Sequence, residues 1–170
     1  FSLIIVLTVA SIVTMASPAS ATGTPDTNGS GSSRTSASAP AYTIDNYTVD
    51  ITVNQFNQLH VEETIKATFH QQRHGIVRSL AKVNHVARMD GSKSTVNAKI
   101  SNLKVLSHRF TTSESSNFTN IKIGDPNAYA KTNEAYRLSY DYNLGTDQLS
   151  QADEFYFNII GAGWNTDITK

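Results

Sequence analysis

The stretch YRLSYDYNL, residues 136–144, decides the fold class of this chain. Apolar and aromatic residues take every second position in it, and Arg137, Ser139, Asp141 and Asn143 take the positions between. Successive side chains of a β-strand point to opposite faces of the sheet, so this alternation predicts a strand with one buried face. A strand that covers a core on one side and meets water on the other is typical of antiparallel sheets.

Two longer runs upstream alternate in the same way. Residues 47–53 and 59–69 each place apolar side chains at every second position, with Glu63 as the one exception, and the intervening Asn54, Gln55, Phe56 and Asn57 break the pattern. Two alternating runs joined by a short polar break predict a β-hairpin.

Shorter runs extend the pattern over the rest of the chain. They cover residues 75–80, 96–105, 121–123 and 155–160. A slip in phase near Ser101 and Asn102 predicts a β-bulge. The last run, Phe155–Ile160, is apolar on both faces and predicts a central strand. With no helical period, the chain is expected to be all-β, an antiparallel β-sandwich of about seven strands, immunoglobulin-like or jelly-roll-like.

The N-terminal part has a different composition. Residues 1–16 are apolar apart from Ser and Thr, and Ala19-Ser20-Ala21 has the A-x-A form of a cleavage site. We therefore expect a signal peptide over residues 1–21, a disordered Ser/Thr/Gly-rich linker over 22–41 and the folded domain over 42–170. An uncleaved N-terminal anchor is the alternative, and both place the domain outside the cytoplasm.

Charge and cysteine content narrow the function classes. Lys plus Arg and Asp plus Glu both number 14, so no basic surface for nucleic acid is indicated. The chain has no Cys, which excludes thiol chemistry and Cys-ligated metal. The five His residues lack a complementary set of ligands, so we expect neither a metal nor another cofactor.

Four segments resemble one known family. They are, in order, HVEETIKATF (60–69), HGIVR (74–78), IKIGD (121–125) and DEFYFNIIGAGW (153–164). They resemble the predicted membrane proteins that carry the domain of unknown function numbered 2207, and the resemblance covers residues 42–168. The last segment is the most specific.

The resemblance implies an architecture but no activity. Members of that family carry a signal peptide, an extracytoplasmic domain and then membrane-spanning helices, which implies a membrane anchor beyond Lys170. This chain departs from the family pattern at Phe157, where Trp is usual, and at Ser79, where an acidic residue is common. The second departure weakens any role built on an Arg and Asp pair at that place.

The acidic residues Asp153 and Glu154 are candidates for general acid chemistry because an aromatic setting can raise a carboxyl pKa. Neighbours on a strand point to opposite faces, so the two cannot form a facing pair. A hydrolase would need a second carboxylate across a cleft, and Glu63 and Asp141 are the candidates.

Aromatic residues offer a binding hypothesis. Trp164, Tyr156, Tyr140 and Tyr142 could stack on the apolar faces of sugars, although the core phase of most of them favours packing. Trp164 follows two glycines in a predicted loop and is the best candidate for an exposed binding residue.

Glu63 and Arg78 are charged residues in the apolar phase of their strands. Alternation turns both side chains toward the core, where an unpaired charge costs several kcal/mol. We therefore predict that they pair with each other across neighbouring strands, with the alternative that one or both reach water at a sheet edge.

These observations favour a non-catalytic interaction or structural module of a cell-envelope membrane protein. An envelope protein or a cell-wall glycan is the expected partner, and the domain is not expected to be an enzyme. The alternatives are a carbohydrate-binding module that uses Trp164 and a hydrolase that uses Glu63 or Glu154.

Overall fold

The computed structural model of the chain describes residues 39–56, 58–88, 91–106, 108–145, 157–161, 163–164 and 166–169. The predicted signal peptide and nearly all of the predicted linker lie outside these ranges. Asp153, Glu154 and Tyr156 lie outside them as well.

Nine strands form the described part, which is all-β and contains no helix. The four-stranded sheet has the order β1 (Tyr42–Val53), β2 (Gln58–Phe69), β9 (Asn133–Asn143) and β6 (Lys99–Leu106). The three-stranded sheet has the order β3 (Gly75–Ala81), β8 (Phe118–Gly124) and β7 (Phe110–Glu114). β4 (Val83–Ala87) and β5 (Lys93–Asn97) form a separate two-stranded ribbon. All of these strand pairs are antiparallel.

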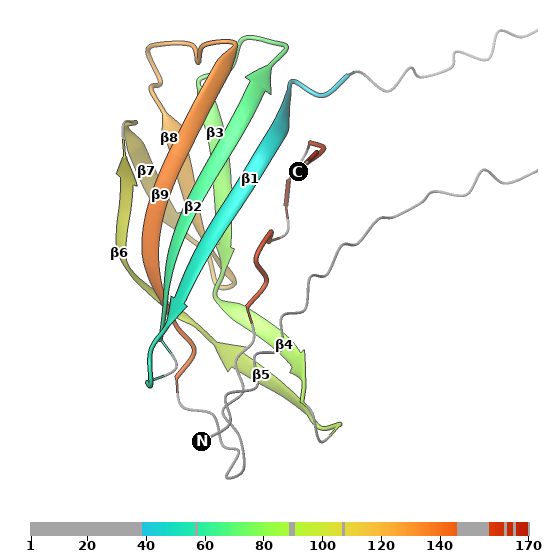
Figure 1. Ribbon diagram of the computed structural model, residues 1–170, viewed down its shortest axis with the longest axis vertical. Coiled ribbons are helices and arrows are strands. Elements are labelled where there is room, and N and C mark those ends of the chain that lie inside the picture. The colour runs from blue at the N-terminus through green and yellow to red at the C-terminus, as the bar shows by residue number, and fades with distance from the viewer. Residues whose placement is uncertain are drawn as a thin grey trace, which may run out of the picture.

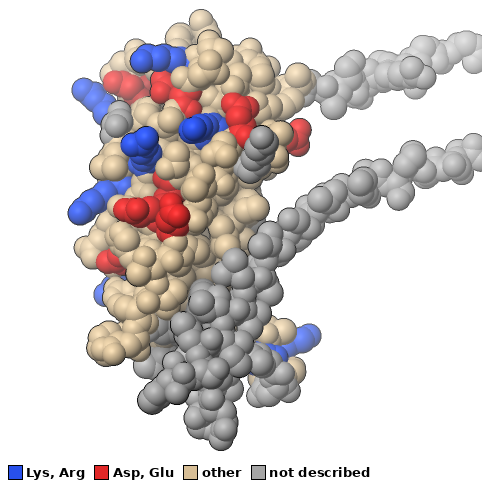
Figure 2. Space-filling view, in the orientation of Figure 1, with Lys and Arg blue, Asp and Glu red and all other residues tan. Residues whose placement is uncertain are grey.

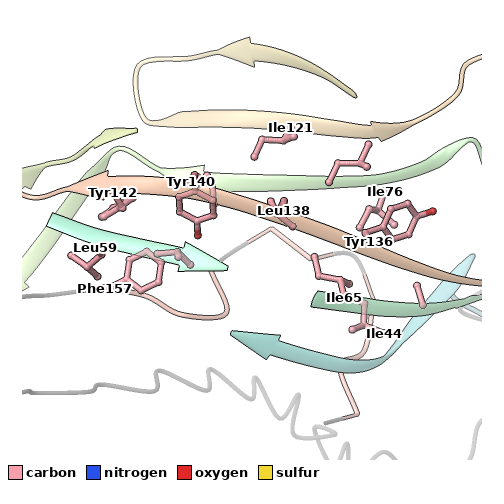
Figure 3. Packing of buried hydrophobic residues seen from close by; sticks show 14 of the residues in the cluster. Ile44, Leu59, Ile65, Ile76, Ile121, Tyr136, Leu138, Tyr140, Tyr142 and Phe157 are labelled. Atoms are coloured by element: carbon pink, nitrogen blue, oxygen red, sulfur yellow. The ribbon is translucent and has the colours of Figure 1, made fainter. Parts of the chain in front are cut away.

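The two larger sheets pack face to face as a sandwich, with the four-stranded sheet in front in Figure 1. Their inner faces share one core, which Figure 3 shows from close by. β2 contributes Leu59, Val61 and Ile65, and the facing sheet contributes Ile121 and Ile123. All five are completely buried, as the alternation of their strands requires.

The predicted hairpin and bulge are both confirmed. β1 pairs with β2 along its length, and the turn between them begins at Asn54, whose side-chain oxygen accepts the backbone N–H of Phe56 and Gln58. The pairing of β6 with β9 shifts between Ser101 and Lys104, and Asn102 there adopts a φ of 53°. Asn tolerates this left-handed conformation better than most residues.

Strand boundaries differ from the prediction in three places. The run 96–105 is two strands, because the chain changes partner: up to Ala98, whose backbone N–H donates to Lys82, it pairs beside β4, and from Lys99 it pairs with β9. β7 is not predicted from the sequence, because all five of its residues are exposed and no alternation of apolar and polar residues marks it. β4 was also missed, and with β7 it raises the count above about seven.

The predicted central strand over 155–160 is wrong for its described residues. Phe157–Ile160 run outside any strand, since the carbonyl groups of Ile159 and Ile160 accept hydrogen bonds from side chains rather than from a sheet neighbour. This stretch begins the C-terminal segment, defined here as the described residues of 157–169. The segment runs beside β1 and β3 along one open side of the sandwich (Figure 1).

The end of the C-terminal segment joins the edge of the four-stranded sheet. Ile168 forms a parallel bridge with Ile44 of β1. The N–H of Ile44 donates to Asp167, and the carbonyl of Ile44 accepts from Thr169. These bonds cover part of the β1 edge. Within the described ranges, no helix has the length and apolar character to span a membrane.

Candidate functional site

Glu63 and Arg78 meet in the middle of the core, between the two sheets. Arg78 Nη2 lies 2.8 Å from Glu63 Oε1, and Arg78 Nε donates to Glu63 Oε2 at 2.9 Å, which makes the contact bidentate. The side chain of Arg78 is 2% exposed and that of Glu63 is 0% exposed. The predicted pairing therefore exists, but Glu63 lies on β2 and Arg78 on β3, so it joins facing sheets rather than neighbouring strands of one sheet.

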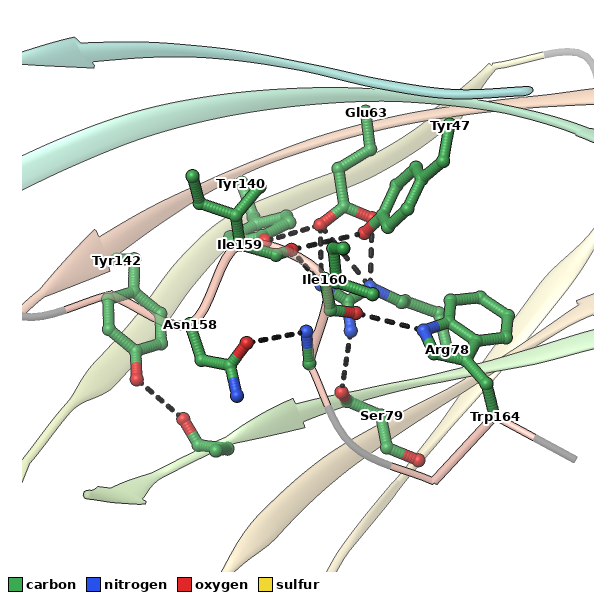
Figure 4. A network of polar contacts seen from close by, with 12 residues as sticks. Tyr47, Glu63, Arg78, Ser79, Tyr140, Tyr142, Asn158, Ile159, Ile160 and Trp164 are labelled. Atoms are coloured by element: carbon green, nitrogen blue, oxygen red, sulfur yellow. Dashed lines mark hydrogen bonds and ion pairs between the residues drawn. The ribbon is translucent and has the colours of Figure 1, made fainter. Parts of the chain in front are cut away.

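Further hydrogen bonds are made by the Glu63 carboxylate and by the Arg78 guanidinium. The hydroxyl of Tyr140 donates to Glu63 Oε1 at 2.7 Å. Arg78 Nη1 donates to the carbonyl of Ser79 at 3.0 Å, and Nη2 also donates to the carbonyl of Ile159 at 3.3 Å. Figure 4 shows this network. A buried ion pair is tolerable only when its remaining polar atoms are also paired, and here each guanidinium nitrogen and each Glu63 oxygen has a hydrogen-bond partner.

The C-terminal segment covers the guanidinium. Tyr47 also donates to the Ile159 carbonyl, at 3.4 Å, and the rings of Tyr47 and Trp164 lie 5.8 and 5.7 Å from the guanidinium carbon of Arg78. Gly161 comes so close that an added Cβ would lie 2.3 Å from Arg78 Nη1. Arg78 is thus the point at which both sheets and the C-terminal segment meet.

The electrostatics of the network follow from burial and charge. Burial, the largest single effect, would lower the pKa of Arg78, but the charge and hydrogen bonds of Glu63 together with the nearby hydroxyls of Tyr47 and Tyr140 outweigh it and raise that pKa above its usual value. Burial raises the pKa of Tyr140, and the negative charge of Glu63 raises it further. Burial likewise raises the pKa of Tyr47. Arg78 is therefore held charged, with neutral phenols around it.

This geometry does not suit general acid catalysis by Glu63. A general acid must reach a substrate atom directly or through one water. Both Glu63 oxygens are engaged inside the core. Asp141, the possible second carboxylate, points to the outer face, where it accepts hydrogen bonds from His60 at 2.7 Å and Asn102 at 2.6 Å. The two carboxylates lie on opposite faces of the sheet.

The predicted aromatic platform is not assembled by the described residues. Tyr140 and Tyr142 are buried in the core, and Tyr142 packs edge-on against Phe157 with ring centroids 4.9 Å apart. Trp164 is half-buried, and its indole N–H donates to Ile160 at 2.8 Å. The ring of Trp164 meets Tyr47 edge-on at 6.0 Å.

Sequence reasoning missed the residues that close the network. The sequence places Tyr47 in a predicted strand and Gly161 directly after one, and neither position indicates a contact with Arg78. Gly161 has a φ of 77°, and its N–H donates to Asn158 Oδ1 at 2.9 Å, so a tight turn brings the backbone onto Arg78. The first of the two glycines in the DEFYFNIIGAGW segment was the available indication of such a close approach. Among the described residues, no group of three His, Asp, Glu or Cys could hold a metal ion.

The fold and this network define an all-β domain with a structural ion pair at its centre. The chain belongs to the family described as predicted membrane protein (DUF2207) N-terminal domain, which matches residues 43–170. It is thus a domain of unknown function from a predicted membrane protein. Searches of curated proteins and of solved structures gave no significant match.

Proposed function

We propose that this domain is a non-catalytic, extracytoplasmic module of a cell-envelope membrane protein and acts in interaction or structure. The observation that carries the proposal is the closed network around Glu63 and Arg78. It uses both buried charges to bind the C-terminal segment to the sandwich. Arg78 also lines a hollow of about 260 Å³ beside Asn84 and Tyr142, but its side chain is only 2% exposed and each of its guanidinium nitrogens is paired inside the protein.

Family membership supports the membrane part of the proposal. In this proposal a membrane-spanning region follows Lys170, and a signal peptide over residues 1–21 exports the domain. A C-terminal segment tied to β1 and β3 would then hold the sandwich at a fixed position relative to the membrane. The segment is held by backbone bonds at Ile44 and by the contacts of Arg78.

The outer face of the four-stranded sheet supports an interaction role. Figure 2 shows basic and acidic side chains interspersed over this face. Asp50 and Glu62 lie opposite each other in the register, and Arg137 of β9 lies opposite Thr64, two residues along β2 from Glu62 and from Lys66. Charges of both signs side by side give positional selectivity for a protein partner rather than a general attraction to polyanions.

Single-cysteine labelling tests the location. The chain has no Cys, so Thr48→Cys on the exposed face of β1 introduces a unique thiol into it. We expect a membrane-impermeant maleimide to label that thiol on intact cells as strongly as after lysis. Labelling that requires lysis would contradict the extracytoplasmic assignment. The unsubstituted protein, treated in parallel, measures the background.

A turnover assay tests the non-catalytic assignment. We expect the purified chain to release no soluble products from cell-wall polysaccharide. Product release that is abolished by Glu154→Gln or Glu63→Gln would establish the hydrolase alternative instead. Circular dichroism of both variants is the control, because Glu63→Gln also changes the core.

A further inference from the structure

An open groove lies at the loop between β2 and β3, away from the buried ion pair. It is a hollow of about 430 Å³ lined by Gln72, Arg73, His74, Val77, Lys122 and Tyr129, among others. We call it the Tyr129 groove. A second hollow of about 480 Å³ adjoins it through Arg73 and Gly75–Val77 and continues past Tyr42.

Tyr129 is an exposed aromatic ring held in a fixed position. It is 57% exposed, although a large aromatic residue gains free energy by burial. One side of the ring stacks on His74, with centroids 4.7 Å apart and planes 29° apart. Nothing in the core requires this ring, and its open side can accept the apolar face of a sugar.

Hydrogen bonds order the support beneath Tyr129. His74 Nδ1 lies 3.2 Å from the Asp125 carbonyl and 3.0 Å from the Ala128 carbonyl, so it carries a proton and donates. The N–H of Ala130 donates to the carbonyl of Arg73 at 2.8 Å, which ties the loop of Tyr129 to the loop of His74. A preordered platform loses little conformational entropy when a ligand binds.

The charge of the groove is positive. Arg73 and Lys122 line it, and no acidic residue is among its described lining residues or those of the adjoining hollow. The carboxylate of Asp125 is engaged elsewhere, since it accepts the N–H of Asn127 at 2.9 Å and lies 3.7 Å from Arg109. A guanidinium suits a carboxylate or a phosphate, which it can bind through two parallel hydrogen bonds.

We propose that the Tyr129 groove binds an anionic polysaccharide, with a sugar ring on the open side of Tyr129 and its carboxylate or phosphate on Arg73 and Lys122. The proposal deepens the interaction role proposed above and rests on it. It moves the glycan site away from Trp164, whose ring is occupied by packing against Tyr47 and Arg78.

Titration calorimetry with the purified chain tests this site. The probes are a polyuronate, a phosphate-bearing wall polysaccharide, neutral dextran and vesicles of phosphatidylglycerol. We expect one or both anionic polysaccharides to bind, at least about tenfold more tightly than dextran, and binding to weaken as salt rises. The polyuronate and the phosphate polymer distinguish a carboxylate ligand from a phosphate ligand.

Matched variants locate the binding. Tyr129→Ala should weaken it about tenfold, and Arg73→Ala about threefold. Phe56→Ala removes a ring that is 70% exposed in the turn between β1 and β2, and Lys66→Ala removes a cation from the outer face of β2. Neither control should change the affinity.

Three outcomes would overturn the proposal: no binding to either anionic polysaccharide, equal binding to dextran, or equal losses in Phe56→Ala and Tyr129→Ala. Preferential binding to the vesicles would also overturn it, because the ligand would then be a lipid surface. Binding is measured in solution, so its failure would leave the result of the cysteine labelling intact.

Discussion

Arg78 has a hydrogen-bond acceptor for each of its three guanidinium nitrogens, and every one of them lies inside the protein. A buried ion pair is often no more stabilising than a well-packed apolar pair, so this contact need not add much net stability. The contact matters most when one partner is removed, because the remaining charge, unpaired in the core, greatly lowers the free energy of unfolding. The pair therefore specifies how the two sheets and the C-terminal segment fit together.

Substitution of Gly161 tests how firmly Arg78 is held. In Gly161→Ala the new Cβ would lie 2.3 Å from Arg78 Nη1, and Glu63 prevents the guanidinium from moving aside cheaply. Gly161 and Gly145 have φ values of 77° and 75°, so their Ala variants share the left-handed backbone strain of about 1–2 kcal/mol. Among the residues that the structure describes, no atom lies within 4 Å of a Cβ placed at Gly145.

We expect Gly161→Ala to lower the free energy of unfolding by about 1–3 kcal/mol more than Gly145→Ala does, because only the first adds a steric clash in a packed site. Urea denaturation of both variants measures the difference. Equal losses would mean that Arg78 can shift without cost.

At the level of strands, Asp141 connects its own strand, β9, with the two strands beside it in the four-stranded sheet, β2 and β6. It lies on β9 and accepts hydrogen bonds from His60 of β2 and Asn102 of the β6 bulge. The hydrogen bond from His60, and then that from Asn102, lower the pKa of Asp141 below its usual value. A carboxyl whose pKa is lowered by folding stabilises the fold above its unfolded pKa, and this stabilisation is lost as the pH falls through its folded pKa.

The stability lost in Asp141→Asn should therefore be constant at neutral pH and shrink as the pH falls below about 4. Urea denaturation of the wild type and the variant over a pH series measures it. Asn102→Ala removes one of the two donors, so in that background the Asp141→Asn loss should be smaller at neutral pH. A loss that grows on acidification would contradict this account of Asp141.

Alternation predicted most elements that have one buried face; it misses β4, whose buried residues Asn84 and Val86 are not both apolar, and β7, which has no buried face. β2 and β9 were predictable because burial imposes a strict two-residue period on Val61 and Leu138. β7 has only exposed residues, so no period could appear in its sequence. Ile159 and Ile160 are apolar without belonging to a strand, because their carbonyl groups accept hydrogen bonds from Arg78 and Trp164. Such contacts depend on tertiary structure that no local pattern encodes.

Alternation likewise turned Glu63 and Arg78 inward, but it could not say which sheet each strand would join. The sequence therefore predicts a buried pair and leaves its setting between two sheets undetermined. The same limit applies to Tyr129, whose groove is built by loops from distant parts of the chain.

The fluorescence of Trp164 reports on the C-terminal segment, because Trp164 lies in that segment and is the only tryptophan of the chain. Replacing both charges, in Glu63→Leu/Arg78→Met, removes one of the two donors to the Ile159 carbonyl and the cation beside the indole without stranding a charge. We expect the emission of Trp164 to shift to longer wavelength and its quenching by acrylamide to increase. Arg137→Met, on the outer face of β9, is the matched control and should change neither. An unchanged emission in the double variant would mean that the segment is held by other contacts.

At the scale of the whole molecule, two sheets, a ribbon and an irregular C-terminal segment share one core. Chain connections cross between the larger sheets after β2, β6 and β8, and the C-terminal segment returns to the β1 edge. Hydrophobic contacts between the sheets are not directional and would tolerate small shifts. The Glu63–Arg78 contact is directional, and we infer that it fixes how the two larger sheets and the C-terminal segment fit together.

A double-mutant cycle on Glu63 and Arg78 tests that claim most directly. The free energy of unfolding is measured by urea denaturation for the wild type, Glu63→Ala, Arg78→Ala and the double variant. Each single substitution should cost about 3–5 kcal/mol, because it leaves the partner charge buried and unpaired. The double variant should lose clearly less than the two single losses added together. Additive losses would contradict the account, since the two residues would then act independently.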